Sequence, residues 1–204
     1  MQTSKKLTLA IETAIDGGSL SLLKGQTELD FRIGKNGISK AEDILENICG
    51  LFEANKVTGE NIDLIIISSD VGSVTGLKIG MATARGLTKA FSSRLAAASL
   101  IDSLVKIISK DNADKYVIVL PVGKNNIFYR RFTLGNQPGA SAIVKTEEFF
   151  GKNRNLDGII YAHQKIIDSK TQFDDDAANV REFISLGENM AKFTATHSRL
   201  ITKR

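Results

Sequence analysis

The chain has 204 residues, 42% of them hydrophobic and 25% charged, which is the balance of a soluble globular protein with one large domain or two small lobes. No apolar stretch approaches the roughly 20 residues of a membrane span, and the N-terminus lacks a signal-peptide run, so we expect a cytoplasmic protein with no membrane partner. Cys49 is the single cysteine, which excludes an intramolecular disulfide, and its apolar surroundings predict a buried thiol. The net charge of +4 permits an acidic partner such as RNA without requiring one, because the basic residues are spread along the chain.

The first part of the sequence predicts three short strands followed by a helix. Apolar runs separated by tight turns place the strands at Lys6–Glu12, Ser19–Lys24 and Glu28–Ile33 and indicate an antiparallel meander. Ser39 and Glu42 have the spacing of a capping box, which predicts a helix start. Six apolar residues at helical spacing are expected on one face of this helix: Ala41, Ile44, Leu45, Ile48, Leu51 and Phe52.

The rest of the chain alternates strands and helices. An apolar run without alternation predicts a buried parallel strand at Leu64–Ser68. The elements expected after it are a helix at Val74–Phe91, a strand at Arg94–Ala98, a helix that begins at Ser99 or Asp102 and reaches Ile108, strands at Tyr116–Leu120, Ile127–Leu134 and Ala142–Lys145, a short helix from Thr146, a strand at Gly158–Ala162 and a last helix at Asp176–Thr194. This order predicts an α/β protein with an N-terminal lobe over residues 1–108 and a smaller lobe over residues 109–204.

A glycine-rich segment, DVGSVTGLKIGMATARGLTKAF, follows the predicted buried strand. It contains neither the G-x-x-x-x-G-K-[ST] pattern of a phosphate loop nor a complete G-x-G-x-x-G. Gly76, Gly80 and Ala84 share one helix face, and we call them the small-residue stripe. Because a glycine inside a helix costs roughly 0.5–1 kcal/mol relative to alanine, the stripe predicts close packing against another helix rather than nucleotide binding.

Two segments resemble the bacterial TsaB family, formerly YeaZ. LTLAIETAIDGGSLSLL resembles the opening strand, turn and strand of that family, and GSVTGLKIGMATARGLTKAF resembles its distinctive segment, usually close to GPGSFTGLRIGLATAKGLA. The resemblance is clear from about Leu7 to Ile108. It implies the actin, Hsp70 and sugar-kinase (ASKHA) fold of two lobes, with the second lobe reduced. TsaB proteins are mostly described as non-catalytic partners of the TsaD transferase, which makes threonylcarbamoyladenosine on tRNA with TsaE and TsaC.

The sequence departs from the family pattern at several places. Asp70 and Val71 stand where the family has a proline, and Lys78 replaces its arginine, so the planar two-pronged donor is lost. The family ending Pro-x-Tyr-Leu-Arg is absent from the final THSRLITKR, so we expect the tail after Thr194 to contribute little. The segment NNIFYRRF would suit stacking on RNA, but a strand with core aromatics and exposed arginines is the favoured interpretation.

The turn after the first strand carries the candidate nucleotide contacts. Resemblance to active ASKHA proteins places Glu12 where an acidic residue handles the metal, and Gly17 and Gly18 where the turn contacts phosphates. A tight hairpin that needs glycine at positive φ is the favoured alternative. We expect no metal site, because the two histidines, His163 and His197, are far apart, and no serine-nucleophile motif is present.

These observations favour an interaction protein over an enzyme. The resemblance implies a non-catalytic TsaB-like subunit that partners a TsaD-type transferase, a TsaE-type ATPase and, indirectly, tRNA, and that forms a homodimer when alone. ATP, ADP and Mg²⁺ are expected only in the complex. The alternatives are an autonomous ATP-dependent enzyme that uses Glu12 and the glycine turn, and a degenerate, self-associating homologue. The residues expected at the partner interface are Ile44, Leu45, Ile48, Leu51, Gly76, Lys78, Gly80 and Ala84.

Overall fold

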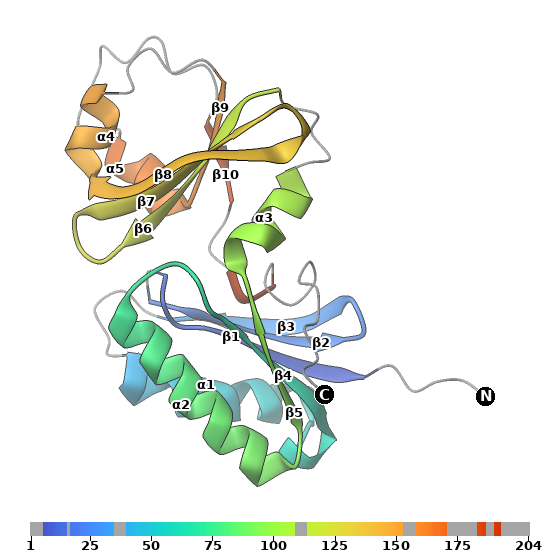
Figure 1. The fold of residues 1–204 in the computed structure, drawn as a ribbon. Helices are drawn as coiled ribbons and strands as arrows, with labels where there is room; N and C mark the ends of the chain where they lie inside the picture. The colour runs from blue at the N-terminus through green and yellow to red at the C-terminus, as the bar shows by residue number, and fades with distance from the viewer. Residues whose placement is uncertain are drawn as a thin grey trace. The chain divides into compact units, whose positions relative to one another are not determined.

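The computed structural model describes residues 6–15, 17–34, 40–108, 114–152, 158–170, 183–186 and 190–192. The chain divides into two compact units: unit 1 comprises residues 1–104 and 189–204, and unit 2 comprises residues 105–188. Within the described residues, each unit contains one five-stranded sheet (Figure 1). The division differs from the expected lobes at the C-terminal end, because residues 189–204 belong to unit 1.

The sheet of unit 1 contains the predicted meander. Its strands are β1 (Leu7–Glu12), β2 (Ser19–Lys24), β3 (Thr27–Ile33), β4 (Ile62–Ser68) and β5 (Arg94–Ala98). They lie in the order β3-β2-β1-β4-β5, with β1 to β3 antiparallel and with β4 and β5 parallel to β1. Six of the seven residues of β4 are buried, which confirms the predicted buried parallel strand.

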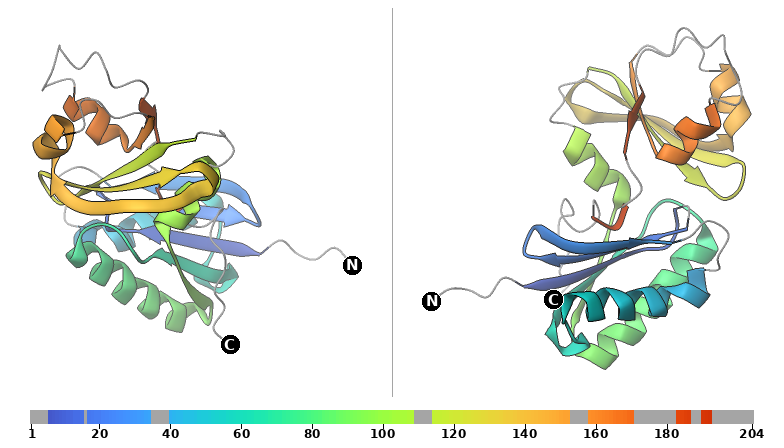
Figure 2. Two further views of the ribbon diagram at one scale, coloured as in Figure 1. Left: turned by 45° about the horizontal axis from the view of Figure 1, so that its top comes forward. Right: turned by 180° about the vertical axis from the view of Figure 1, so that it is seen from behind.

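Two helices of unit 1 cover one face of this sheet. The helical elements of the unit are α1 (Lys40–Asn55), η1 (Gly59–Asn61), α2 (Val74–Phe91) and α3 (Leu100–Ile108), which continues past the unit boundary. Both α1 and α2 lie on the same side of the sheet (Figure 2). Their core residues pack with those of the strands: Leu9, Ile11, Leu20, Leu22, Ile44, Ile48, Leu51, Phe52, Ile62, Ile65, Ile67 and Ala84.

The outward face of α1 differs from the expectation in two residues. Leu45 is 54% exposed and Cys49 is exposed, so the predicted buried thiol is wrong and Leu45 does not share the buried face. Both lie to one side of the narrow stripe formed by Ile44, Ile48 and Leu51, which meets the sheet. Ser39 and the side chain of Glu42 fall outside the described residues.

Unit 2 is a second mixed sheet with two short helices. Its elements are β6 (Tyr116–Val122), β7 (Asn126–Thr133), η3 (Leu134–Asn136), β8 (Gln137–Lys145), α4 (Thr146–Lys152), β9 (Ile159–Ala162), α5 (Gln164–Lys170) and β10 (Phe183–Ser185). The strand order is β10-β9-β6-β7-β8. Its core joins the strands to α4 and α5 through Val117, Val119, Ile127, Phe149, Ile160, Ala162 and Ile166.

Unit 2 also holds the main errors of the predicted elements. Phe183–Ser185 is a strand paired with β9, not part of the predicted last helix, because backbone pairing at the sheet edge outweighs apolar spacing at helical period. Residues 190–192, which belong to unit 1, are helical, as predicted. Residues 176–182, 187–189 and 193–194 of the predicted helix and the tail after Thr194 lie outside the described residues. Strand β8 begins at Gln137, before the predicted start at Ala142, because an edge strand tolerates Pro138. Helix α5 was not predicted.

Candidate functional site

The start of α2 lies directly against the loop that follows β1. The backbone N–H of Ser73 donates to the carbonyl oxygen of Ala14 over 2.9 Å, and the Thr13 hydroxyl donates to the carbonyl oxygen of Gly76 over 2.6 Å. A Cβ atom at Gly76 would overlap the carbonyl oxygen of Thr13, and one at Gly80 would overlap the Thr13 hydroxyl. These glycines therefore make room for a loop of their own unit, and their predicted contact with another helix is wrong.

Gly72 and Asp70, which both precede α2 in the sequence, make further contacts within unit 1. Gly72 has a φ of 126°, and a Cβ atom there would come within 2.5 Å of Ala14. Asp70 precedes Val71, which stands where the family segment GPGS has its proline. Its carboxylate accepts hydrogen bonds from the Ser99 hydroxyl over 2.6 Å and from the Leu100 backbone N–H over 2.9 Å, at the start of α3. Asp70 is therefore a helix cap, a role that the sequence pattern did not reveal.

Glu12 holds the loop between β1 and β2. The side chain is 1% exposed, and Oε1 accepts the backbone N–H groups of Ala14 over 2.5 Å and of Ile15 over 2.9 Å. The Ser68 hydroxyl lies 3.3 Å from the same oxygen. Together these donors satisfy Oε1 of this buried carboxylate through contacts within the fold. The structure thus gives the carboxylate a role in holding the loop.

Both glycines of the loop have the backbone conformation that the hairpin alternative requires. Gly17 has a φ of 85° and Gly18 a φ of 81°, a region that favours glycine. The Gly34 backbone N–H donates to the Gly18 carbonyl oxygen over 2.9 Å, and a Cβ atom on Gly17 would come within 2.7 Å of the Gly34 carbonyl oxygen. The loop therefore lies against the end of β3 without space for a ligand between them.

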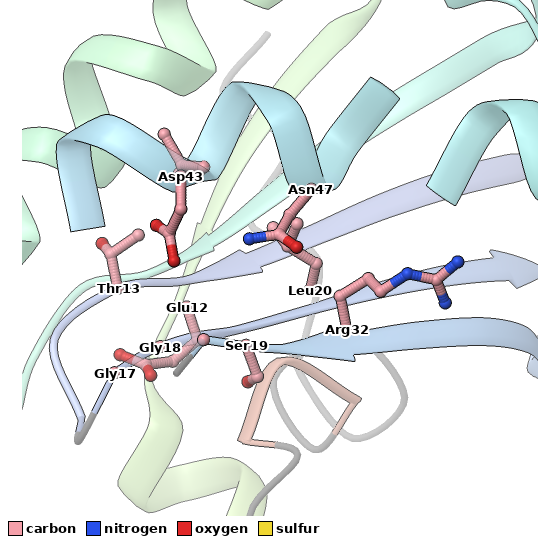
Figure 3. Close-up of a pocket in the computed structure, with 11 residues that line it drawn as sticks. Glu12, Thr13, Gly17, Gly18, Ser19, Leu20, Arg32, Asp43 and Asn47 are labelled. Carbon is pink, nitrogen blue, oxygen red and sulfur yellow. The ribbon is translucent and has the colours of Figure 1, made fainter. Parts of the chain in front are cut away.

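A small cavity brings the candidate nucleotide contacts together. Figure 3 shows Asp43 and Asn47 pointing from α1 toward the strands, with Glu12, Gly17 and Gly18 below them. The cavity has a volume of about 20 Å³. This is room for about one water molecule, whereas small-molecule sites usually measure roughly 300–1,000 Å³. In this conformation the cavity does not accommodate a nucleotide.

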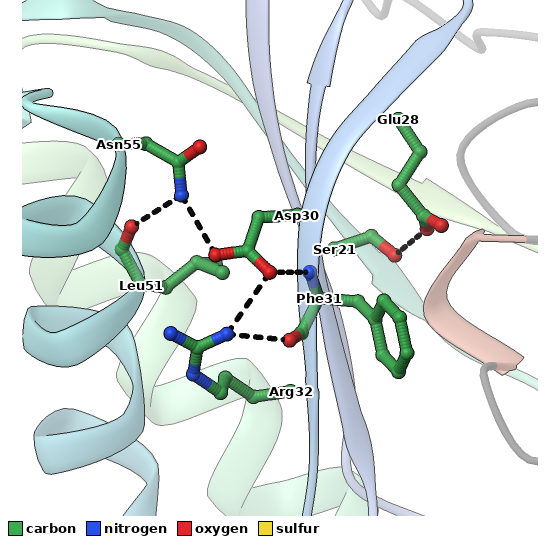
Figure 4. Close-up of polar contacts among 7 residues, drawn as sticks. All are labelled: Ser21, Glu28, Asp30, Phe31, Arg32, Leu51 and Asn55. Carbon is green, nitrogen blue, oxygen red and sulfur yellow. Dashed lines mark hydrogen bonds and ion pairs between the residues drawn. The ribbon is translucent and has the colours of Figure 1, made fainter.

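A polar network fixes the end of α1 to β3 (Figure 4). Asp30 accepts from the Asn55 side chain over 2.9 Å, from the Phe31 backbone N–H over 2.8 Å and from Arg32 over 3.0 Å. Asn55 also donates to the carbonyl oxygen of Leu51 over 2.8 Å. Burial raises the pKa of Asp30, but the hydrogen bonds from Asn55 and Phe31 and the Arg32 guanidinium outweigh it, so the pKa lies below its ordinary value of 3.8.

This lowered pKa predicts a pH dependence of stability. The network stabilises the fold above pH 3.8, where Asp30 is ionised in both the folded and unfolded chain, and this contribution is lost as pH falls through the lower, folded pKa. We expect the stability difference between the natural protein and Asp30→Asn to be larger at pH 7 than at about pH 3. Urea unfolding at both pH values measures it. A difference that stays constant or grows on acidification would contradict the role of this carboxylate.

The predicted interface residues separate into buried and exposed groups. Six of them lie in unit 1 with little or no access to solvent: Ile44, Ile48, Leu51, Gly76, Gly80 and Ala84. Leu45 and Lys78 alone among the eight are exposed. The buried group supports the fold and does not reach an external surface in this structure.

Small residues also lie on the solvent side of α2, where the sequence analysis did not place the interface. Ala82 and Gly86 are exposed and four residues apart, and a Cβ atom at Gly86 would meet no atom within 4 Å. Lys78, Ala82 and Gly86 are exposed and repeat every four residues along α2, and we call these three residues the outer helix face. The signal was present in the sequence, because Ala82 and Gly86 have the same spacing as Gly76 and Gly80.

Two further observations concern other classes of site. In the described part of the chain, no three His, Cys, Asp or Glu side chains gather as a metal-binding group. None of the helices that the structure describes combines the length and apolar character needed to cross a membrane.

Comparisons with known proteins agree with the fold. The model of the family TsaD, tRNA N6-adenosine threonylcarbamoyltransferase, matches residues 39–200. YeaZ from Pseudomonas aeruginosa has a TM-score of 0.60 at 14% identity, with 94% of this chain and 90% of that chain covered. An uncharacterised protein described as similar to the peptidase YeaZ from the same organism gives a TM-score of 0.62 at 15% identity, with 94% and 89% covered.

A more distant structure extends the comparison. The ethanolamine utilization protein EutJ from Carboxydothermus hydrogenoformans has a TM-score of 0.52 at 6% identity, with 95% of this chain and 89% of that chain covered. No curated protein matches the sequence. The structural likenesses confirm the predicted α/β fold of the actin-like class.

Proposed function

The chain belongs to the TsaD family of tRNA N6-adenosine threonylcarbamoyltransferases as a divergent YeaZ-like member, and from this we propose that it is a non-catalytic subunit of a tRNA-modifying complex. In this proposal it binds a TsaD-type transferase that makes threonylcarbamoyladenosine on tRNA. A TsaE-type ATPase joins the complex, the tRNA is held mainly by the other subunits, and the isolated chain forms a homodimer in the cytoplasm.

The observation that carries the proposal is the exposed glycine on α2. Gly86 lies inside an 18-residue helix, where glycine costs roughly 0.5–1 kcal/mol relative to alanine. No atom of the described residues would meet a Cβ atom there, so packing among them does not require this glycine. Gly86 and Ala82 instead leave a flat surface on which another helix can approach closely. In this proposal Leu45, which is 54% exposed on α1, adds an apolar contact with the partner.

The geometry around Glu12 supports a non-catalytic role. An ATP-dependent enzyme of this fold class would use the β1–β2 loop to contact phosphates. Here the Glu12 carboxylate accepts hydrogen bonds from that loop, and the adjacent cavity measures about 20 Å³. We therefore propose that ATP, ADP and Mg²⁺ bind only in the assembled complex and not in this loop.

Association tests this proposal directly. We expect the natural protein and a TsaD-type transferase from the same organism to sediment together as a stable complex. Gly86→Leu should weaken this complex at least tenfold, because the side chain would hold the two helices apart at their closest approach. Sedimentation velocity of the mixture, at matched concentrations, gives the affinity.

A matched control is available in the other unit. Gly151 lies in α4, and a Cβ atom there would likewise meet no atom within 4 Å. We expect Gly151→Leu to bind the transferase like the natural protein. Circular dichroism must show that both variants are folded. A folded Gly86→Leu variant with unchanged affinity would reject the outer helix face as the interface, and absence of any complex with the natural protein would reject the partner.

A further inference from the structure

Unit 2 contains a cavity of about 610 Å³. It is lined by the turn between β6 and β7, the start of α4 and one side of α5. This volume lies within the range of roughly 300–1,000 Å³ that small-molecule sites occupy. The cavity around Glu12, at about 20 Å³, is far smaller. The described residues of unit 2 therefore enclose a cavity large enough for a ligand. The proposed subunit role does not use this cavity.

The lining of this cavity is basic. Lys124 comes from the β6–β7 turn, Lys145 ends β8 and Lys165 lies on α5, so three different elements each contribute an ammonium group. Glu147 is the one carboxylate among the described lining residues, which leaves a net charge of about +2. Lys124 and Lys145 are exposed and form no ion pair with any residue that the structure describes.

Backbone contacts hold two of these lysines on the same rim. Asn126 pairs directly with Lys145 across β7 and β8, and Lys124 is two residues before Asn126 in the tight turn. The Thr146 backbone N–H and hydroxyl both donate to the carbonyl oxygen of Asn125, over 3.0 and 3.1 Å. The turn is thereby tied to the start of α4. The two ammonium groups are thus attached to backbone that is fixed in place, although their side chains are long.

Neutral polar groups complete the lining. Asn125, Asn126, Thr146 and Ser169, whose side chains carry amide and hydroxyl groups, also line this space. Amides and hydroxyls are the groups that hydrogen-bond sugars and bases, and lysine ammonium groups bind phosphate as point charges. A space of this size with a positive rim and neutral polar walls suits a phosphorylated ligand of nucleotide size better than an apolar one.

We propose that this cavity of unit 2 binds the phosphate groups of a nucleotide-sized ligand, through Lys124 and Lys145. The phosphates come either from a free nucleotide or from a segment of single-stranded RNA. The proposal does not depend on the TsaD-type partner, because all of the lining residues belong to this chain.

Calorimetric titration of the isolated full chain tests the site. The probes are ADP, inorganic pyrophosphate and a short single-stranded RNA, each at low and moderate salt. We expect binding of at least one probe, with Lys145→Ala and Lys124→Ala each lowering its affinity about tenfold, the effect of one charged hydrogen bond. Binding should also weaken as salt rises, because exposed charges are screened.

Lys152→Ala is the matched control. Lys152 is an exposed lysine on α4 that pairs with Glu148 over 2.6 Å and does not line the cavity. We expect this variant to bind like the natural protein. Binding of ADP or pyrophosphate supports a free nucleotide as the source, and binding of the RNA alone supports RNA. No binding of any probe, or an equal loss in all three lysine variants, would overturn the proposal while leaving the proposed subunit role untouched.

Discussion

Gly76→Ala is expected to lower the free energy of unfolding by about 3 kcal/mol. The new Cβ atom would overlap the carbonyl oxygen of Thr13, which belongs to backbone and moves only with the loop. Overpacking of this kind costs roughly 1–3 kcal/mol. Displacement of Thr13 also weakens its hydrogen bond to the Gly76 carbonyl oxygen, which contributes about 1 kcal/mol. For a chain of this size the melting temperature should fall by roughly 6–12 °C. Thermal unfolding followed by circular dichroism measures it.

The same substitution elsewhere in α2 provides the control. Gly86→Ala meets no atom within 4 Å, so we expect it to raise stability by roughly 0.5–1 kcal/mol. Opposite signs for two identical changes in one helix would establish which side of α2 faces the fold. If Gly76→Ala were as stable as the natural protein, the close contact between α2 and the β1 loop would not exist in solution.

Glu12→Ala is the second substitution with a large expected effect. It removes the acceptor for the backbone N–H groups of Ala14 and Ile15 in a site where the side chain is 1% exposed. Each buried donor left without a partner costs roughly 1–3 kcal/mol, so for the two donors we expect a loss of roughly 2–6 kcal/mol. Urea unfolding followed by fluorescence or circular dichroism gives the value.

Glu12→Gln separates the structural role from a catalytic one. Glutamine keeps a carbonyl oxygen that can accept the same two N–H groups, so we expect less than half of the loss seen with alanine. A stable Glu12→Ala variant would show that the carboxylate does not hold the loop, and would restore the interpretation in which it serves a bound metal or nucleotide.

Local patterns predicted the elements that depend on local signals. The bounds of α2 agree with the sequence prediction because Ser73 caps its first turn and its apolar and small residues repeat at helical spacing to Phe91. The meander and the buried β4 follow in the same way from strand periodicity and tight turns. The helix predicted over Phe183–Ser185 was wrong because this strand pairs with β9, which is distant in the sequence, and no local signal describes that pairing.

The candidate site was harder to predict because spacing shows which residues share a face but not what covers the face. Gly76 and Gly80 have the same separation as Ala82 and Gly86, yet the first pair contacts Thr13 and the second faces solvent. Leu45 likewise has the spacing of a core residue and lies 54% exposed. Only the fold distinguishes a stripe that supports the chain from one that is available to a partner.

If this chain is a non-catalytic subunit of the tRNA-modifying complex, as we propose, formation of threonylcarbamoyladenosine should require the chain but none of its side chains as a catalytic group. The most direct test is a reconstitution with TsaD-, TsaE- and TsaC-type proteins and tRNA, in which the modified nucleoside is quantified by mass spectrometry. We predict modification with the natural chain and with a folded Glu12→Gln variant, and at least a tenfold loss with Gly86→Leu or without the chain. Full modification without the chain would contradict the claim that it is required. Loss of modification with a folded Glu12→Gln variant that still binds the transferase would contradict the claim that it is non-catalytic.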